Sequence, residues 1–238
     1  MTERYNPDYI HHKDSKIVST IREVVFGMED GMVSTLGAVT GIAVGSQDQA
    51  AVLLAGSVII AVESISMGMG SYISSLSERD IVKRMLYEEK TEIKEFPIEE
   101  KEELEGMYIE DGWPKKLASD MAKVAGKNKK LMLQEMAYRE LKVSPDEKKH
   151  PLRNGIFMFF SYIIGGAIPL FAYFIMPMNV AINFSIGVTL IGLFVLGAGT
   201  TRYTKGNWLK MGSRVLILGS IALLAGYVIG KLATIINL

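Results

Sequence analysis

Four long stretches of the chain are apolar and almost free of charge, a pattern typical of helices that cross a membrane. The first runs from Gly31 to Gln47 without a charged side chain, and the second runs from Gln49 to Ser77 with Glu63 as its only charge. Residues 46–48 are polar and separate the two. We therefore expect one membrane-spanning helix on each side of this connection.

The third stretch, from Asn154 to Thr201, is too long for a single crossing. It is about twice the roughly 20 residues that a helix needs to span a bilayer, so it must turn once. We expect the turn at residues 176–179, because Pro177 lacks a backbone donor and restricts the residue before it. The fourth stretch, from Val215 to about Ile236, adds one more span. The pattern thus predicts an all-α membrane protein with five transmembrane helices.

Basic residues are unevenly distributed over the connections between these spans. They precede the first span and separate the fourth from the fifth, at Arg4, Lys13, Lys16, Arg22, Arg202, Lys205, Lys210 and Arg214. The connections at 46–48 and 176–179 have none. Because cytoplasmic connections carry the excess of Lys and Arg, we expect the N-terminus and the 202–214 loop in the cytoplasm, and the C-terminus on the opposite side.

A highly charged segment between the second and third spans divides the chain into three parts. We expect an N-terminal tail and two spans over residues 1–78, a cytoplasmic helical domain over 79–152, and three spans over 153–238. From Glu88 to Asp111 this domain has eleven acids and three lysines, a net charge of −8. Prolines and glycines interrupt the segment and strand signals are weak, so we expect three or four short helices.

The composition excludes several functional classes. The 238 residues carry 26 basic and 26 acidic side chains, so no overall positive charge favours nucleic acid as a partner. The chain has no cysteine, which excludes disulfides and thiolate metal sites. It contains neither a phosphate-binding G-x-x-x-x-G-K motif nor the zinc-hydrolase motif H-E-x-x-H. ATP-driven pumping and zinc hydrolysis therefore have no support, and we expect the protein not to be an enzyme.

The spacing of acids in the charged segment predicts a metal site. The candidate ligands are Glu89, Glu92, Glu100, Glu103, Met136 and Glu140. The first four form two i,i+3 pairs, which place like charges close together on one side of a helix, and the methionine stands i,i+4 from the last glutamate. Carboxylates with a thioether suit a borderline divalent metal better than Mg²⁺ or Ca²⁺. The alternatives are a solvated acidic face and, for the methionine, core packing.

Acids also lie within or beside the first two spans. Asp30 precedes the uncharged part of the first span, and Glu23 lies two helical turns earlier on the same face. Glu63 lies near the middle of the second span, with Met67 following at i+4. A charge at that depth costs at least ~2.5–3.5 kcal/mol, so it normally faces a partner, a cavity or an ion path. The alternatives are a helix N-cap or an acid at the membrane interface for Asp30, and a structural hydrogen bond for Glu63.

Small residues at four-residue intervals predict close contacts between spans. Gly37, Gly41 and Gly45 repeat in the first span, and Gly226 and Gly230 repeat the spacing in the last. Such steps let the backbones of two helices approach each other closely.

These residues resemble a known family. The stretches DGMVSTLGAVTGIAVG from Asp30 and ESISMGMGSYISS from Glu63, with the acidic segment that follows, are similar to the vacuolar iron transporter family over nearly the whole chain. The resemblance implies a five-span homodimer in the lipid bilayer, with a metal-binding cytoplasmic domain and an ion path along the dimer interface. By position it assigns Asp30, Met67 and Glu23 to that path. Plant members have an intramembrane acid where this chain has Ile59, one helical turn before Glu63.

The expected function is therefore transport of Fe²⁺, and also Mn²⁺, out of the cytoplasm in exchange for protons, with the ion as cargo and no other cofactor. Asp30 and Glu63 would alternate between metal and proton, because burial favours a protonated carboxyl and a bound cation favours the carboxylate. The protein would lie in the cell membrane of a prokaryote or the vacuolar membrane of a eukaryote. The alternatives are a membrane-anchored, ferritin-like iron buffer without transport, and a structural or signalling membrane protein.

Overall fold

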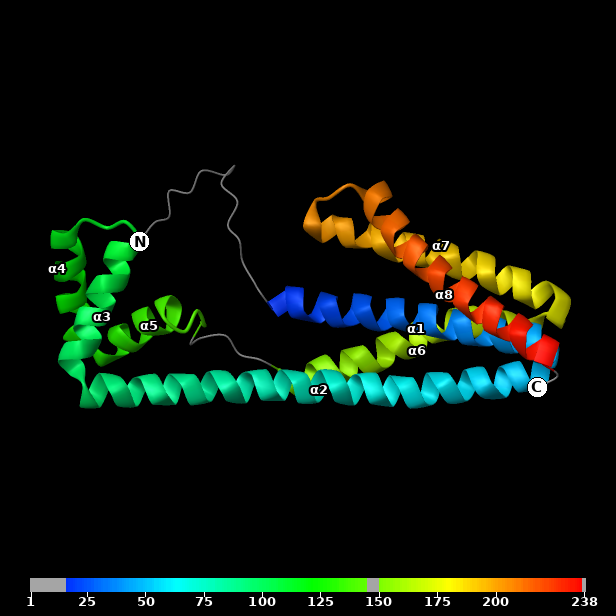
Figure 1. The fold of residues 1–238 in the computed structure, drawn as a ribbon, viewed down its shortest axis with the longest axis horizontal. Coiled ribbons are helices and arrows are strands. Elements are labelled where there is room, and N and C mark those ends of the chain that lie inside the picture. Colours follow the sequence, from blue (N-terminus) through cyan, green and yellow to red (C-terminus); the bar gives the residue numbers. More distant parts are fainter. Residues whose placement is uncertain (1–15, 145–149, 237–238) are drawn as a thin grey trace, which may run out of the picture. The chain divides into compact units, whose positions relative to one another are not determined.

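A computed structural model describes residues 16–144 and 150–236, and within these ranges every regular element is a helix (Figure 1). The helices are α1 (Lys16–Ser46), α2 (Gln49–Glu95), α3 (Pro97–Glu110), α4 (Lys115–Gly126), α5 (Lys129–Arg139), α6 (Pro151–Ile175), α7 (Met178–Thr204) and α8 (Trp208–Ile236). The predicted all-α class is confirmed. Arg4 and Lys13, used above for orientation, lie outside the described residues.

The chain divides into two compact units. Residues up to Tyr72 and from Pro151 onward form one, here called the membrane unit, and Ile73–His150 form the other, here called the acidic unit. The membrane unit contains α1, the first half of α2, and α6 to α8. The acidic unit contains the rest of α2 with α3, α4 and α5.

Both turns predicted in the apolar regions are confirmed. The helix α1 ends at Ser46 and α2 begins at Gln49, while α6 ends at Ile175 and α7 begins at Met178. In the first turn the Asp48 carboxylate accepts a 2.9 Å hydrogen bond from the Ala50 N–H and so caps α2. In the second, Pro177 has the extended backbone (φ −66°, ψ 150°) that stops one helix before the next begins.

The helix that contains the second predicted span extends beyond the apolar stretch that ends at Ser77. The helix α2 continues without interruption to Glu95 and is 47 residues long. No glycine or proline follows Gly70 until Pro97, so nothing in this sequence breaks the helix earlier. The helix ends where Phe96 leaves the helical conformation and Pro97 begins α3.

Four described helices, α2, α6, α7 and α8, are long and apolar enough to cross a membrane. Their length and composition are those of an integral membrane protein. The helix α1 has 31 residues but is less apolar, because Glu29 and Asp30 lie inside it among serines, threonines and glycines. The five-span count, which requires α1 to cross as well, stays a prediction.

Glycines bring α1 into direct backbone contact with its neighbours. A Cβ atom on Gly41 would lie 2.8 Å from the Gly226 carbonyl oxygen of α8, and one on Gly31 would lie 2.8 Å from the Gly166 nitrogen of α6. The glycine steps predicted to permit close approach therefore do so between the first and last helices. Figure 1 shows α1 running beside α6, with α8 approaching α1 toward the C-terminal end of α1.

Replacing Gly31 with alanine should destabilise the membrane unit. The added methyl group would meet backbone atoms of α6, which cannot rotate away as a side chain would, at a cost of about 1–3 kcal/mol. Thermal unfolding of the full chain in detergent measures the effect. Gly187→Ala on α7 is the control, since a Cβ there has no heavy atom within 4 Å. Equal unfolding temperatures for the two variants would contradict the packing argument.

The acidic unit has an apolar core of its own. Three helices follow α2 in it, in agreement with the three or four short helices expected. The core is formed by Ile93, Leu104, Tyr108, Ala118, Ala122, Ala125, Met132 and Met136. Asn128 begins α5 by accepting hydrogen bonds from the backbone N–H groups of Lys130 and Leu131.

Candidate functional site

Two of the predicted carboxylate ligands in the acidic unit are buried. Glu89 on α2 is 1% exposed and Glu100 on α3 is 7% exposed. Oε1 of Glu89 and Oε2 of Glu100 are buried and have no hydrogen-bond partner among the residues that the structure describes. Buried carboxylate oxygens without a partner are rare and require either a proton or a cation.

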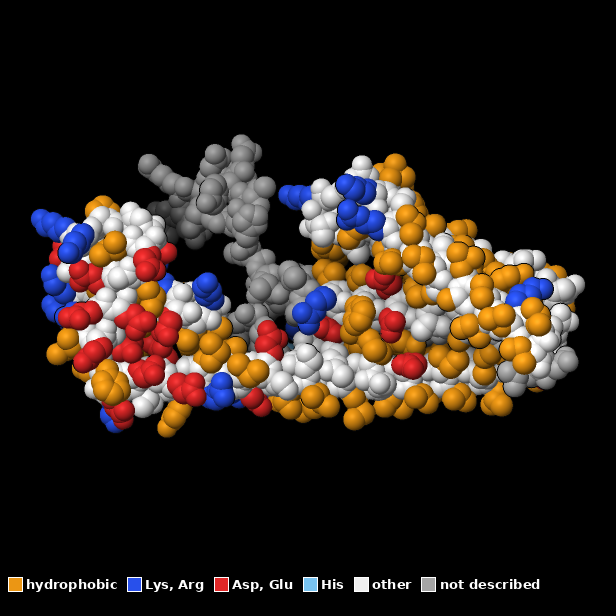
Figure 2. Space-filling model, in the orientation of Figure 1, with side chains coloured by type: hydrophobic (Ala, Val, Ile, Leu, Met, Phe, Trp, Pro, Cys, Tyr) orange, Lys and Arg blue, Asp and Glu red, His pale blue; other side chains and the backbone are white. Residues whose placement is uncertain are grey.

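Neighbouring acids act on these two carboxyls. Burial raises the pKa of Glu89 to about 9, and Glu140 and Glu100 add to the shift. The pKa of Glu100 is also raised, chiefly by burial, and that of Glu103 is raised by burial and by the charges of Glu140 and Glu92. Each of the five predicted glutamates therefore interacts with at least two of the others, and Glu100 interacts with all four. Figure 2 shows acidic side chains gathered over this part of the acidic unit.

These acids lie on α2, on α3 and directly after α5, but their side chains are not arranged as ligands of one metal ion. Glu92, Glu103 and Glu140 are exposed, whereas Glu89 and Glu100 are buried. In the described ranges, no three Asp, Glu or His side chains are grouped so that they could hold a metal ion. Metal binding would require the acids to lose protons and turn toward a shared ion. Whether these residues bind metal stays a prediction.

Met136 lies in the core of the acidic unit. Its side chain is fully buried beside Leu104 and Tyr108. Core packing, the alternative considered above, therefore accounts for its position, and its role as a ligand stays a prediction.

A second polar cluster in the acidic unit was missed by sequence reasoning. Tyr108 on α3 donates a 3.0 Å hydrogen bond to Glu135 Oε2 on α5, and Arg139 Nε donates a 3.2 Å bond to the same oxygen. The Arg139 guanidinium also lies 4.4 Å from the centre of the Tyr108 ring and pairs with Asp111. This cluster joins α3 to α5. Glu100 lies near the start of α3, and Glu140 directly follows α5. No spacing rule could have paired residues on separate helices.

In the membrane unit, Glu23 is buried and fully paired. Its Oε1 accepts a 2.8 Å bond from Arg22 Nη2, and its Oε2 accepts a 2.7 Å bond from the Ser71 hydroxyl of α2. Glu23 is 3% exposed. The predicted path acid thus joins α1 to α2. No sequence pattern pairs Glu23 with Ser71, which lies on a different helix.

Asp30 and Glu63 lie within electrostatic range of each other and of the Tyr162 hydroxyl on α6. Tyr162 is fully buried, and its hydroxyl is 2.6 Å from Ser34 Oγ. Ser34 in turn can donate to the Asp30 carbonyl at 2.7 Å. The structure therefore brings together acids from α1 and α2 with a tyrosine that sequence reasoning did not select. A tyrosine hydroxyl inside an otherwise apolar stretch was the available signal.

The acid and the thioether predicted on α2 differ in exposure. Glu63 is exposed on the surface of the described chain, and Met67, one turn later, is half-buried. Ile59, which takes the place of the acid in plant relatives, is also half-buried. Val62, directly before Glu63, is a large exposed apolar side chain, and Ile65 is exposed on the other side of α2.

The chain is similar over most of its length to one protein family and to several named relatives. The family model of the VIT family matches residues 21–231. The chain is 29% identical over 223 residues to vacuolar iron transporter 1 of Tulipa gesneriana, covering 92% of this chain and 90% of the relative. It is 27% identical over 224 residues to vacuolar iron transporter 1 of Arabidopsis thaliana, with 93% and 90% covered. The vacuolar iron transporter of Plasmodium berghei (strain Anka) is 29% identical over 232 residues, with 93% and 84% covered.

Proposed function

Because this chain belongs to the VIT family, we propose that it carries a divalent transition metal, Fe²⁺ and also Mn²⁺, out of the cytoplasm in exchange for protons. Iron is proposed because its relatives are named vacuolar iron transporters. Manganese is proposed because carboxylates suit both ions. The observation that carries the proposal is that Asp30 of α1 and Glu63 of α2, two acids from different helices of the membrane unit, lie close enough for their charges to interact.

Two neighbouring carboxylates can exchange a metal for protons. Their charges repel each other unless a cation or a proton lies between them. A metal ion that enters therefore displaces protons, and protons return when the metal leaves. Met67, one turn after Glu63, would add a sulfur ligand that favours Fe²⁺ over Mg²⁺. Tyr162 and Ser34 would hold the α1 side of this site in place through their 2.6 Å contact.

We propose that a second copy of the chain covers the Glu63 face. Glu63 is exposed on α2 among apolar side chains. An acid exposed to lipid at this depth would cost at least ~2.5–3.5 kcal/mol. A homodimer that buries this face would remove that cost and place two copies of the acid along one ion path.

The acidic unit would supply metal to this path from the cytoplasm. Its buried, unpaired oxygens on Glu89 and Glu100 offer a place for a cation, and the exposed Glu92, Glu103 and Glu140 would attract one. The distribution of Lys and Arg over the connections supports a cytoplasmic location for this unit. These same oxygens favour the second candidate function, a membrane-anchored iron buffer.

Flux into proteoliposomes tests transport directly. The full chain is reconstituted in sealed vesicles that contain a metal-sensitive dye and a pH dye, and Fe²⁺ or Mn²⁺ is added outside under reducing conditions. We expect metal to enter while the lumen becomes more alkaline as protons leave. Empty vesicles are the control for leakage. Metal bound to the protein without any lumenal signal would reject transport and favour the buffer.

A further inference from the structure

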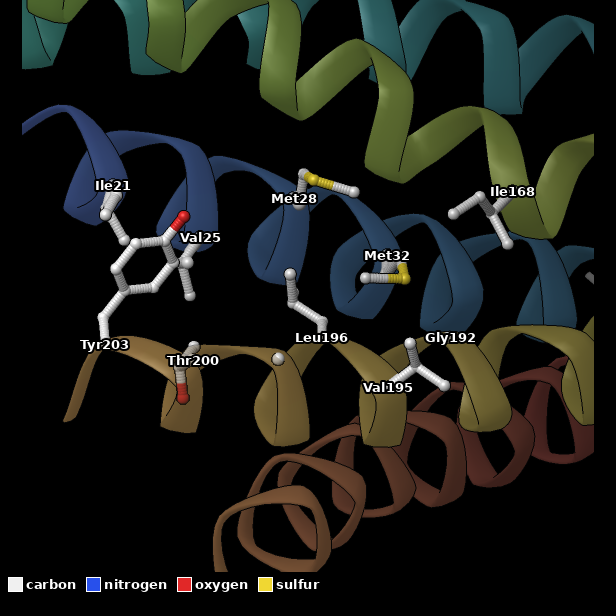
Figure 3. Close-up of a pocket in the computed structure, with 11 residues that line it drawn as sticks. Ile21, Val25, Met28, Met32, Ile168, Gly192, Val195, Leu196, Thr200 and Tyr203 are labelled. Atoms are coloured by element: carbon white, nitrogen blue, oxygen red, sulfur yellow. The ribbon is translucent and has the colours of Figure 1, made fainter. Parts of the chain in front are cut away.

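An elongated crevice in the membrane unit has no part in the proposed ion path. It has a volume of about 410 Å³ and lies between α1 and α7, with α6 closing one end. Figure 3 shows its two walls, formed by Ile21, Met28 and Met32 of α1 and by Leu196, Thr200 and Tyr203 of α7. The volume is within the range of sites that hold one small ligand.

The crevice and the candidate path use opposite faces of α1. Val25 and Met32, which line the crevice, are seven residues apart and share one face of the helix. Glu23 and Asp30 are also seven residues apart and share another. The two pairs are offset by two residues, which corresponds to roughly half a helical turn. A ligand in the crevice would therefore not contact the acids of the path.

The lining of the crevice fits an acyl chain. Apart from Thr200 and Tyr203 at one end, the side chains are aliphatic or methionine. Protein interiors contain few voids larger than a water molecule, so a crevice of this size within membrane-spanning helices must be filled. Methionine side chains adapt to irregular apolar partners. A lipid chain is the apolar molecule that surrounds these helices.

One end of the crevice is polar and basic. Tyr203 lines this end, and Arg202 and Lys205 on either side of it are exposed. Arg22, beside Ile21 on the facing end of α1, has a side chain that is 70% exposed. Figure 2 shows Lys and Arg side chains gathered at this end of α7 and α8. Basic pockets between transmembrane helices bind anionic lipid headgroups.

We propose that the crevice between α1 and α7 binds one anionic phospholipid, with an acyl chain between Met32 and Leu196 and the phosphate beside Arg202 and Lys205. The site requires the membrane unit to lie in a bilayer but does not depend on which ion the protein moves, or on whether it moves one. Retention of this lipid would hold α1 and α7 at their present separation.

Native mass spectrometry of the full chain in detergent tests the acyl-chain site. The delipidated protein is titrated with phosphatidylglycerol or phosphatidylcholine of identical chains, and we expect one phosphatidylglycerol per protomer, bound about tenfold more tightly than phosphatidylcholine. Gly199→Leu should abolish this binding, since a side chain there enters the crevice without meeting protein atoms. Gly187→Leu is the matched control, because that glycine of α7 also faces open space but lies outside the crevice.

Charge variants test the headgroup contact. The double variant Arg202→Gln with Lys205→Gln should remove the preference for phosphatidylglycerol and leave phosphatidylcholine binding unchanged. Lys210→Gln with Arg214→Gln removes two exposed charges from α8 and should keep the preference. Equal binding of the two lipids by the unaltered protein, or unchanged binding after Gly199→Leu, would overturn the proposal. A change in the number of protomers per complex after Gly199→Leu would also overturn it, because a second copy would then occupy the crevice.

Discussion

Replacing Glu89 with glutamine should stabilise the acidic unit at neutral and alkaline pH. The pKa of Glu89 is raised from 4.5 to about 9, mainly by burial, so the folded unit keeps a proton that the unfolded chain releases. The stability from this group is complete below pH 4.5 and is lost as the pH rises toward 9. Glutamine has the shape of the protonated carboxyl at every pH and removes this loss.

We expect a gain of at least about 1 kcal/mol at pH 8, or roughly 4–8 °C in a unit of this size. Hydrogen exchange of the amides of α3 to α5, measured in the detergent-solubilised full chain, reports the stability of this unit separately from the membrane unit. Glu102→Gln is the control, since Glu102 is an exposed acid on α3. A stability that falls equally with pH in Glu89→Gln and in the unaltered chain would refute the assignment.

The same variant should lose metal binding. A ligand carboxyl must give up its proton before it binds a cation, so metal affinity of the unaltered protein should increase with pH. Glutamine cannot become an anion, and Glu89→Gln should weaken Mn²⁺ binding at least tenfold and reduce its pH dependence. Calorimetry of the full chain measures both. Unchanged affinity would show that Glu89 is not a metal ligand.

Replacing Asp30 with asparagine should abolish transport while preserving the fold. Asparagine keeps the size of the side chain, and the 2.7 Å hydrogen bond from Ser34 goes to the backbone carbonyl of residue 30, which the substitution leaves in place. The substitution removes one of the two charges that share a cation and one of the groups that exchanges a proton. We expect metal flux and proton counter-flux to fall together, by at least tenfold, in vesicles of matched protein content.

Asp80→Asn provides the control for this change. Asp80 is an exposed acid of α2 in the acidic unit, paired with Arg79, and its replacement should leave flux close to that of the unaltered protein. Size-exclusion chromatography confirms that both variants fold. Wild-type flux through Asp30→Asn would show that this acid, which lies inside α1, takes no part in an ion path.

Short sequence motifs predicted where helices end better than they predicted which side chains contact each other. Pro177 and the polar residues 46–48 located two turns, because helix-breaking chemistry is carried by the residues themselves. The link from Glu23 to Ser71 joins residues 48 positions apart, and that from Ser34 to Tyr162 joins residues 128 apart. A single sequence carries no information that pairs such residues.

Spacing likewise selected the acids of the candidate metal site without distinguishing their environments. Glu89 and Glu92 share one side of α2, yet the first is buried and the second is exposed. Burial depends on how α3 and α5 pack against α2, which the i,i+3 pattern does not specify. The same pattern could not separate Met136 as a ligand from Met136 as a core residue.

The glycine contacts between α1 and α8 restrict which helices can move relative to each other during a transport cycle. Where Gly37 and Gly41 meet Gly226 and Gly230, backbone lies against backbone, and a rotation of either helix would drive a Cβ of a neighbouring residue into a carbonyl group. These two helices should therefore behave as one rigid body. On its other side α1 faces the crevice toward α7, where space remains. Alternating access, if it involves α1, would then occur by shear against α7, and the composition of the surrounding bilayer would influence its rate.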